Sequence, residues 1–382
     1  MLSEKRLKQI LYGIAILAII LGVYGFYSRL LFGERDVNYG SYVNWGLWVA
    51  MYLFFAGMAA GSYMIATCDY LFHLSLFKGT GKYALWGSVV TLPAALIFIG
   101  FDLGHMERVW KVYLNPSFSS LLAQLVWSYT LFLIVIFLSV WAVYKENWGL
   151  LKPVMIIGLV LSIFVSGGVG ALLGVNASRA TLHTAMLPAQ FPILNLSSGV
   201  ALMIVMVCFF NVVGDEQQRR RLIRLLSSLL SILIVIKAYF LWVDYSQALY
   251  SGVPEAVDAV NLVLFGPYGW AFWILQIALG MVFPLIVFVQ NDTIKNQFLF
   301  GAASVFVLIG LAVGRTAIIF PALAIPELEG LAEAFTGPHL NFDYVPSLME
   351  WSVTCGIVGL SILSFLIGID YINFLKKPAG RS

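Results

Sequence analysis

Residues 44–61, Asn-Trp-Gly-Leu-Trp-Val-Ala-Met-Tyr-Leu-Phe-Phe-Ala-Gly-Met-Ala-Ala-Gly, are the stretch that decides the fold. The stretch contains no charged residue, so it predicts a helix that can lie within a lipid bilayer. The small side chains at Ala56, Gly57, Ala60 and Gly61 predict a seam that a second helix can approach closely. Amide and aromatic side chains surround its start, and we expect this outer lip to hold a flat, amphipathic ligand at the membrane edge. The outer lip consists of Asn38, Tyr39, Tyr42, Asn44 and Trp45.

The composition indicates a membrane protein. Of the 382 residues, 61% are hydrophobic and 11% are charged, and the mean hydropathy is +0.91. Soluble domains contain about 25% charged residues, so this chain does not belong to that class. The net charge of +3 reflects basic residues in the connecting loops and gives no indication of nucleic-acid binding.

Ten apolar segments are long enough to cross the hydrocarbon of a bilayer, which takes about 20 residues. We therefore expect an all-α polytopic membrane protein that interacts with the lipid bilayer along its length. The first segment is too long for the core of a signal peptide and is expected to remain as an anchor helix. The expected spans are 9–31, 43–72, 84–104, 120–144, 153–174, 189–213, 222–249, 268–290, 297–320 and 347–375.

The basic residues orient these spans. An even number of spans puts both termini on one side of the membrane, and fifteen of the 22 Lys and Arg residues then share that side. Lys237 lies within a span. The positive-inside rule predicts that both termini are cytoplasmic, in a multi-pass protein of the cell membrane. The basic residues expected at the outer side are Arg29, Arg35, Arg108, Lys111, Arg179 and Arg315.

We expect two four-helix bundles, made of spans 2–5 and spans 6–9, with spans 1 and 10 as additions. A faint repeat supports this arrangement, because residues 170–174 precede Arg179 much as residues 310–314 precede Arg315. Four spans separate the two motifs, so both arginines are expected to emerge at the outer face. The corresponding segments are an N-terminal tail and anchor at 1–37, the bundles at 38–188 and 189–320, and an outer loop, last span and cytoplasmic tail at 321–382.

A dense group of charged residues follows the third span. Asp102 ends that span, and His105, Glu107 and Arg108 follow within six positions. His105 and Arg108 are three residues apart, so they share a face if this segment is helical. We expect a site or a docking surface here, the alternative being an ordinary charged outer loop.

Arg179 and His183 lie four residues apart between the fifth and sixth spans, so they can point at one acceptor. A histidine donates a hydrogen bond or takes up a proton near neutral pH. An arginine stabilises negative charge that develops on an oxygen atom. We expect catalytic roles for both, although a boundary histidine bonded to a neighbour is the alternative for His183.

Lys237 and Asp244 lie two helical turns apart within the seventh span, where an ionisable side chain is costly unless it is paired or hydrated. They predict either a proton path or a structural pair that joins the two bundles. Asp69 and His73, near the cytoplasmic end of the second span, either begin such a path or face the lipid headgroups. Glu350 begins the last span, where an acidic side chain favours a helix N-terminus.

The histidines and cysteines argue against metal-based redox groups in this chain. Cys68, Cys208 and Cys355 fall singly within spans and form no cluster-binding motif. Of the four histidines, His105 and His183 share an outer level, but both fall in or beside loops. We therefore expect neither a haem nor an iron–sulfur cluster, and no metal site.

Several segments in a fixed order resemble the NrfD/PsrC family, the membrane quinone-interacting subunits of respiratory oxidoreductases, in its ten-span type (DsrP, HmcC and ActC-like proteins). The resemblance runs from about Asn38 to Gly368. The matching segments are 44–46 with 57–61, 102–105 with 115–116, 170–174 with Arg179, 195–199, 239–245, 266–273 and 344–351.

This resemblance implies a quinone module of two four-helix bundles that is not active alone. It implies that menaquinone or menaquinol binds near the outer face, and that a ferredoxin-like iron–sulfur subunit docks there to exchange electrons. It also implies a multihaem cytochrome c or molybdopterin subunit as a further partner, as in complexes of sulfur metabolism, and a possible proton path. Family members often carry a histidine where this chain has Asn44. The implied quinone-site residues are Asn38, Tyr39, Asn44, Trp45, Glu107, Arg108, Arg179 and His183, with Asp102 and His105 as proton carriers.

Two other functions are compatible with ten spans. A secondary transporter is one, although transporters tend to show inverted repeats and polar sites at the membrane midplane. A structural anchor that only docks partner subunits is the other. Substrate flux through the isolated chain would favour the transporter, and a bound quinone would exclude the simple anchor.

Overall fold

The computed structural model describes residues 4–210, 212–290, 296–335 and 337–376, and this described part is helical, without strands. Ten of its helices are long and apolar enough to cross a membrane, which confirms the predicted number of spans. They are α1 (Glu4–Phe32), α2 (Leu47–Tyr70), α3 (Gly81–Asp102), α5 (Leu121–Tyr144), α6 (Trp148–Gly174), α7 (Met186–Phe209), α8 (Glu216–Tyr250), the π-helical η3 (Ala271–Val282) with α10 (Phe283–Val289), α11 (Gln297–Ala324) and α13 (Leu348–Tyr371).

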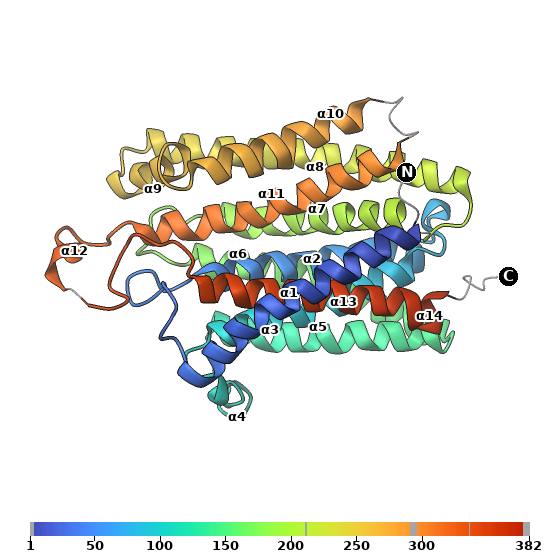
Figure 1. The fold of residues 1–382 in the computed structure, drawn as a ribbon, viewed down its shortest axis with the longest axis horizontal. Coiled ribbons are helices and arrows are strands. Elements are labelled where there is room, and N and C mark those ends of the chain that lie inside the picture. Colours follow the sequence, from blue (N-terminus) through green and yellow to red (C-terminus); the bar gives the residue numbers. More distant parts are fainter. Residues whose placement is uncertain (1–3, 211, 291–295, 336, 377–382) are drawn as a thin grey trace.

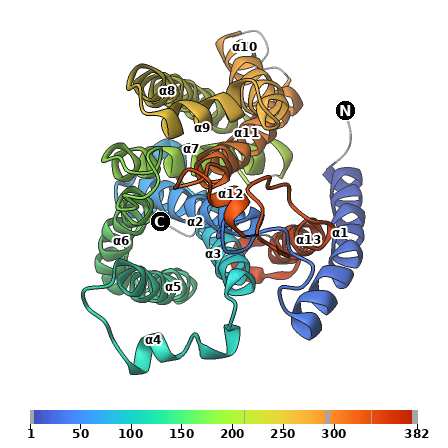
Figure 2. The ribbon, with the colours of Figure 1, turned by 90° about the vertical axis from the view of Figure 1, so that its left-hand side faces the viewer.

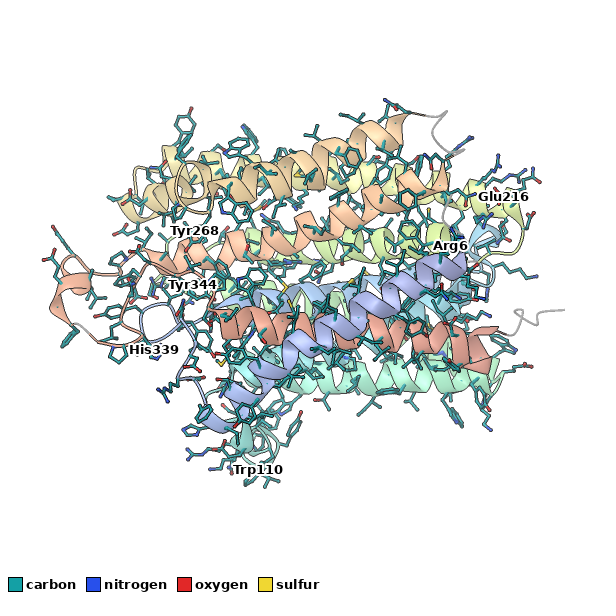
Figure 3. All side chains as sticks on the ribbon, viewed as in Figure 1. Arg6, Trp110, Glu216, Tyr268, His339 and Tyr344 are labelled. Carbon is teal, nitrogen blue, oxygen red and sulfur yellow. The ribbon has the colours of Figure 1, made fainter. Side chains whose placement is uncertain are left out.

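The spanning helices run side by side along the long axis of the molecule (Figure 1). The start of α1 and the short helix α14 (Asn373–Lys376) lie at the same end, which also holds Arg6 and Glu216 (Figure 3). The opposite end, called the outer end here, carries the connecting loops with Trp110, His339 and Tyr344 (Figure 3). The short helices of the loops are η1 (Ser75–Phe77), η2 (Met106–Arg108), α4 (Lys111–Leu114), α9 (Pro254–Leu264) and α12 (Leu331–Ala334).

The cytoplasmic location of the termini stays a prediction. Three of the basic residues that support it, Lys295, Lys377 and Arg381, lie outside the described residues.

Helix contacts group the spans into two sets of four and one pair. Helix α2 contacts α3 and α6, and α5 contacts the same two helices, so these four close into a ring. Helix α7 contacts α8 and α11, while η3 contacts α11 and α10 contacts α8, which closes a second ring. Helix α1 packs along α13, and this pair lies at one side of the molecule when it is viewed along the helices (Figure 2).

The small-residue seam of α2 is where the two rings meet. A Cβ atom added to Gly61 would lie 1.9 Å from the backbone oxygen of Asn195 in α7, and one added to Gly57 would lie 2.2 Å from Asn195 Oδ1. Gly199 of α7 meets the backbone of Gly61 equally closely. The predicted close approach is confirmed, because only glycine lets the two backbones pass at this separation.

Two arginines expected at the outer surface are instead buried within spans. Arg29 lies in α1 with 2% of its side chain exposed, and Arg315 lies in α11 with 4% exposed. The expectation that Arg315 emerges beside the outer loops is wrong, because α11 continues to Ala324. The repeat therefore equates a loop arginine, Arg179, with one inside a helix.

Candidate functional site

The outer lip is largely occupied in holding the outer end of the fold together. The amide of Asn38 donates to the backbone oxygen of Val345 at 2.8 Å. Asn44 is exposed and Trp45 is half-buried. Tyr39 is buried, and burial, together with the nearby carboxylates, raises the pKa of its hydroxyl group. Tyr39 therefore acts as a neutral hydrogen-bond donor.

Three carboxylates from distant parts of the chain gather around Tyr39. Asp102 ends α3, Glu350 begins α13, and Glu34 follows α1, and all three interact electrostatically with the Tyr39 side chain. The hydroxyl of Tyr39 donates to Glu34 Oε1 at 3.4 Å. We call Asp102, Glu34 and Glu350 the outer carboxyl cluster. It brings together residues that are up to 316 positions apart in the sequence.

Arg29 is the cation beside this cluster, and its shortest hydrogen bonds go to backbone carbonyl groups. Its Nε and Nη2 atoms donate to the backbone oxygens of Phe101 and Leu103, each at 2.8 Å. Its contact with Glu34 is longer, at 3.4 Å. The guanidinium group therefore mainly satisfies the carbonyl groups at the end of α3, a helix terminus that leaves such groups without intrahelical partners.

Glu350 is fully buried and only half satisfied. One oxygen, Oε2, accepts from the Ser347 backbone at 2.7 Å and from the Tyr344 hydroxyl at 3.1 Å, which completes a capping box at the start of α13. Its other oxygen, Oε1, makes no hydrogen bond of good geometry with the described residues, although the backbone N–H groups of Asn38 and Tyr39 interact with this carboxyl group. The buried Oδ1 of Asp102 also lacks a partner among the described residues. Two buried carboxyl oxygens at the outer end are therefore available to a proton or to a ligand.

Tyr344 links the outer carboxyl cluster to the start of α2. Its hydroxyl accepts from the backbone N–H of Leu47 at 2.8 Å. Burial is the main cause that raises the pKa of this hydroxyl group, and the negative charge of Glu350 raises it further. A Cβ atom on Gly46 would lie 2.6 Å from the same oxygen. Glycine is required here because the start of α2 passes directly beside Tyr344 and Glu350.

The charged residues after Asp102 do not join the cluster. The segment is broken into the short helices η2 and α4, and α4 stands away from the bundle in the end view (Figure 2). Glu107 Oε1 contacts His105 Nδ1 at 3.0 Å and Arg108 Nε at 3.5 Å, and all three side chains are more than half exposed. Of this predicted site, only Asp102 is brought to the buried interior.

Arg179 and His183 do not share an acceptor. Arg179 donates to the backbone oxygens of Ile325 at 2.7 Å and Tyr42 at 3.2 Å, and its Nε lies 2.9 Å from Glu327 Oε1. The exposed His183 instead contacts the Gly174 backbone oxygen at 3.1 Å through Nδ1. The expected common target is wrong, because the segment forms tight turns and the two side chains diverge.

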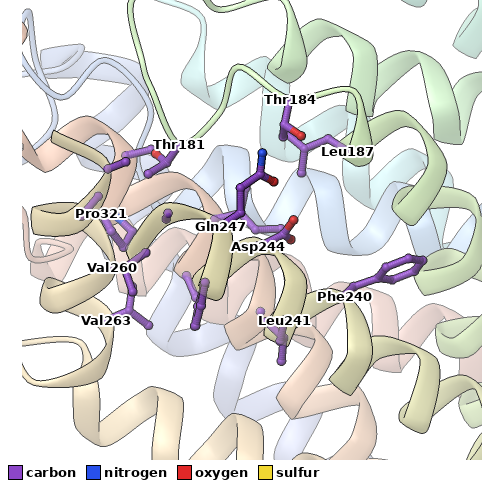
Figure 4. Close-up of a pocket in the computed structure, with 18 of the residues that line it drawn as sticks. Thr181, Thr184, Leu187, Phe240, Leu241, Asp244, Gln247, Val260, Val263 and Pro321 are labelled. Atoms are coloured by element: carbon purple, nitrogen blue, oxygen red, sulfur yellow. The ribbon is translucent and has the colours of Figure 1, made fainter. Parts of the chain in front are cut away.

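His183 lies at a cavity of about 220 Å³ that extends between α7, α8, α9, η3 and α11. Asp244 and Gln247 of α8 point into it, with Val260 and Val263 of α9 and Pro321 of α11 around them (Figure 4). Lys237 also lines this cavity. Lys237 and Asp244 do not pair: Lys237 donates to Gly310 O at 3.2 Å, and Asp244 accepts from Gln190 at 2.8 Å.

Asp69 and His73 lie at the other end of the molecule. Asp69 Oδ2 accepts from the backbone N–H groups of Gly79 and Gly81, each at 2.9 Å, so it stabilises the start of α3. His73 is exposed and has a positive φ of 51° at the end of α2. Neither residue reaches the cavity or the outer carboxyl cluster.

Sequence reasoning missed several residues of these two sites. Glu34 and Gln276 gave no pattern that links them to their neighbours, and Tyr344 was noted only within the segment 344–351. Arg29 and Arg315 were counted with the basic residues of the outer side. One feature of the sequence could have indicated their burial. Both arginines lie within apolar segments, where a charged side chain usually has a buried partner. Among the described residues, no group of three or more His, Cys, Asp or Glu side chains could hold a metal ion.

Comparison with known proteins gives one family. A family model described as "Polysulphide reductase, NrfD" matches residues 37–327. A selenate reductase subunit from Mesobacillus selenatarsenatis is 28% identical over 97% of this chain and 95% of its own length. The integral membrane subunit of an Hdr-like menaquinol oxidoreductase from Archaeoglobus fulgidus is 23% identical, with 96% and 94% covered. The integral membrane subunit of menaquinone reductase from Nitratidesulfovibrio vulgaris is 21% identical, with 94% and 90% covered.

Proposed function

Because the chain belongs to the NrfD family, we propose that it is the quinone-reactive membrane subunit of a respiratory oxidoreductase complex. Relatives that match nearly the whole chain are named as membrane subunits of a menaquinol oxidoreductase and a menaquinone reductase. The proposed ligand is menaquinone or menaquinol, bound near the outer end, where Asn38, Tyr39, Asn44 and Trp45 adjoin the outer carboxyl cluster.

The observation that carries this proposal is the pair of buried carboxyl oxygens, Asp102 Oδ1 and Glu350 Oε1, at the outer end. A bound quinol supplies electrons and protons together. Asp102 and Glu350 can hold those protons at the outer end, because each carboxyl group has one buried oxygen that makes no hydrogen bond of good geometry with the described residues. Tyr39, as a neutral donor, can orient a ligand oxygen toward them.

Electrons would leave through a partner rather than through this chain. We propose that a ferredoxin-like iron–sulfur subunit docks on the outer end, over the loops that carry His105, Glu107 and Arg108. A multihaem cytochrome c or molybdopterin subunit would complete the complex. The exposed charges of this loop support the outer end as the docking face.

A proton path is a separate part of the proposal. Lys237 and Asp244 line a cavity that reaches His183 at the outer end, so they can pass protons between the interior and that surface. Asp69 and His73 would serve the opposite end. The support for these two is weaker, because the Asp69 carboxylate already accepts two backbone hydrogen bonds.

The test is quinol-linked reduction of the partner subunit by the purified complex carrying Asp102→Asn or Glu350→Gln. Each change keeps the side-chain shape and removes the proton-accepting oxygen, so we expect the rate to fall about 100-fold, within the usual range for a lost general base. Glu146→Gln, in an exposed carboxylate of the turn between α5 and α6 at the opposite end of the molecule, should leave the rate unchanged. Full activity of both buried-site variants in an assembled complex would exclude this site. The Arg179→Gln/His183→Gln double variant tests the second predicted group in the same assay.

A further inference from the structure

We call Lys237, Gln276 and Arg315 the floor of the cavity between α7, α8 and α11. Several of their hydrogen-bonding atoms have no partner in the described part of the protein. Gln276 is completely buried, and neither its Oε1 nor its Nε2 atom has a partner among the described residues. The Nη1 atom of Arg315 is likewise buried without a partner in the described part of the chain. Both side chains line the cavity together with Lys237.

These groups are costly in an empty cavity. Burial of an unsatisfied amide or guanidinium nitrogen loses the hydrogen bonds that water would provide. Lys237 and Arg315 also bring two basic groups to the same floor, while the nearest carboxylate lining the cavity, Asp244, is bonded to Gln190. Such groups persist in membrane interiors mainly where they have a function.

The backbone around the floor is also specialised. Gln276 lies in the middle of η3, and π-helical turns are rare and concentrate at functional sites. A Cβ atom on Gly280 of η3 would lie 2.7 Å from the Cα of Gly310 in α11. The two helices are therefore so close at this point that only glycine fits between their backbones. A Cβ atom on Gly314 of α11 would lie 3.3 Å from Lys237 Nζ and 3.7 Å from Gln276 Nε2, so these two side chains meet beside Gly314, the neighbour of Arg315 in the chain.

The walls above the floor are mostly apolar, although Asp244 and Gln247 also point into the cavity. Leu187, Leu194 and Val260 line the cavity, as do Phe240 and Leu241 of α8 (Figure 4). The volume of about 220 Å³ is far more than the 10–15 Å³ or so that one water molecule needs in the same measure. A polar floor below apolar walls is typical of sites for ring-shaped amphipathic ligands.

We propose that this cavity is a second quinone-binding site, separate from the outer carboxyl cluster. Oxygen atoms of the ligand accept from Arg315 and Lys237 and, in the hydroxyl form, donate to Gln276. A simple inorganic anion fits less well, because it leaves the amide oxygen of Gln276 and the apolar walls without a partner. The chemical class of the ligand rests on the proposed function. The existence of the site rests on the buried atoms of Gln276 and Arg315 that lack partners among the described residues.

The experiment is photo-crosslinking of the purified complex with an azido-quinone, followed by mapping of the labelled peptides. We expect two labelled regions, one in α2 or α3 and one in α8, α9 or α11, both protected by unlabelled menaquinone. Gln276→Leu should lower the label in the second region about tenfold or more, equivalent to about 1.4 kcal/mol of binding. The first region should keep its label. Ser304→Ala is the matched control, because Ser304 is buried in α11 outside the cavity and already bonded to Phe300 O.

The outcomes separate the two proposals. Label confined to α2 and α3 would overturn the second site and leave the proposed function intact. Label confined to α8, α9 and α11 would support the second site and overturn the outer position. Absence of protectable label from both regions would overturn both. A Gln276→Leu protein that is more thermostable but equally labelled would show that the floor is filled by water rather than by the ligand.

Discussion

Arg315 of α11 donates through Nη2 to Oδ1 of Asn195 in α7 at 2.6 Å, deep inside the protein. The same Asn195 packs over the glycine seam of α2, and its amide nitrogen donates to Ser166 of α6 at 2.8 Å. The guanidinium carbon of Arg315 also lies 4.0 Å from the centre of the Phe191 ring. One asparagine thus joins both four-helix sets and fixes the arginine at the cavity floor.

Replacement of Asn195 should destabilise the whole bundle. Asn195→Ala leaves Nη2 of Arg315 buried without its acceptor, a loss of roughly 2 kcal/mol or more. We expect a lower midpoint of thermal unfolding for the detergent-solubilised protein. Ser304→Ala, which removes a buried hydroxyl elsewhere in α11, should have a much smaller effect. An unchanged midpoint for Asn195→Ala would show that the hydrogen bond contributes little.

The seam itself should not accept a methyl group. Gly61→Ala puts a Cβ atom 1.9 Å from the Asn195 backbone oxygen, so α2 and α7 must separate. We expect a strong loss of folded, monodisperse protein in size-exclusion chromatography. In Gly100→Ala the new Cβ atom meets no described atom within 4 Å, and alanine favours a helix by about 1 kcal/mol over glycine. That control should fold at least as well as the original chain.

Arg179 should order the outer loops. Its guanidinium group joins the Tyr42 loop to the end of α11 and to Glu327, and burial lowers the pKa of this side chain, an effect that the Glu327 charge opposes. We expect Arg179→Gln to raise hydrogen–deuterium exchange in residues 38–46, because both carbonyl contacts are lost.

His183→Gln is the comparison for this change, since His183 bonds only to the Gly174 backbone oxygen among the contacts described. It should leave exchange in residues 38–46 unaltered. Equal exchange in the two variants would mean that Arg179 does not hold the loops.

Proton movement through the cavity should depend on Asp244. Asp244→Asn and Lys237→Met each remove a group that can exchange a proton, so we expect fewer protons translocated per electron in proteoliposomes containing the complete complex. Quinol oxidation at the outer carboxyl cluster should continue. Asp258→Asn, in an exposed residue of α9 outside the cavity, provides the control. Unaltered proton-to-electron ratios in both cavity variants would remove these residues from the path.

The predicted span boundaries differ from the structure by only a few residues, and the differences have local causes. The seventh span was predicted from residue 222, but α8 begins at Glu216, because Asp215 caps a polar first turn that extends beyond the apolar stretch. The fifth was predicted from Pro153, but α6 begins at Trp148, where the side chain of Asn147 caps the helix by accepting from the Leu150 backbone, and Pro153 lies inside the helix. Hydropathy marks the membrane core and not the caps.

The sites were predicted less completely than the spans. Asp102 was chosen for its place after the third span and does lie in a buried cluster, yet its partners Glu34 and Glu350 come from the two ends of the chain. Lys237 and Asp244 were chosen from one argument and His183 from another, and a single cavity holds all three. Gln276, which lines the same cavity, has no sequence pattern that distinguishes it from other amides.

By itself, the sequence determined the class, the ten spans and the close approach at Gly57 and Gly61, because each depends on the length, polarity or size of neighbouring residues. Only the tertiary structure decided that Arg315 is buried against Asn195 while Arg179 stays in a loop. Only it brought Asp102 to Glu350, and Lys237 to Gln276. Those contacts depend on how each helix is rotated about its axis and on which helices are neighbours. Both are set by packing across the whole molecule.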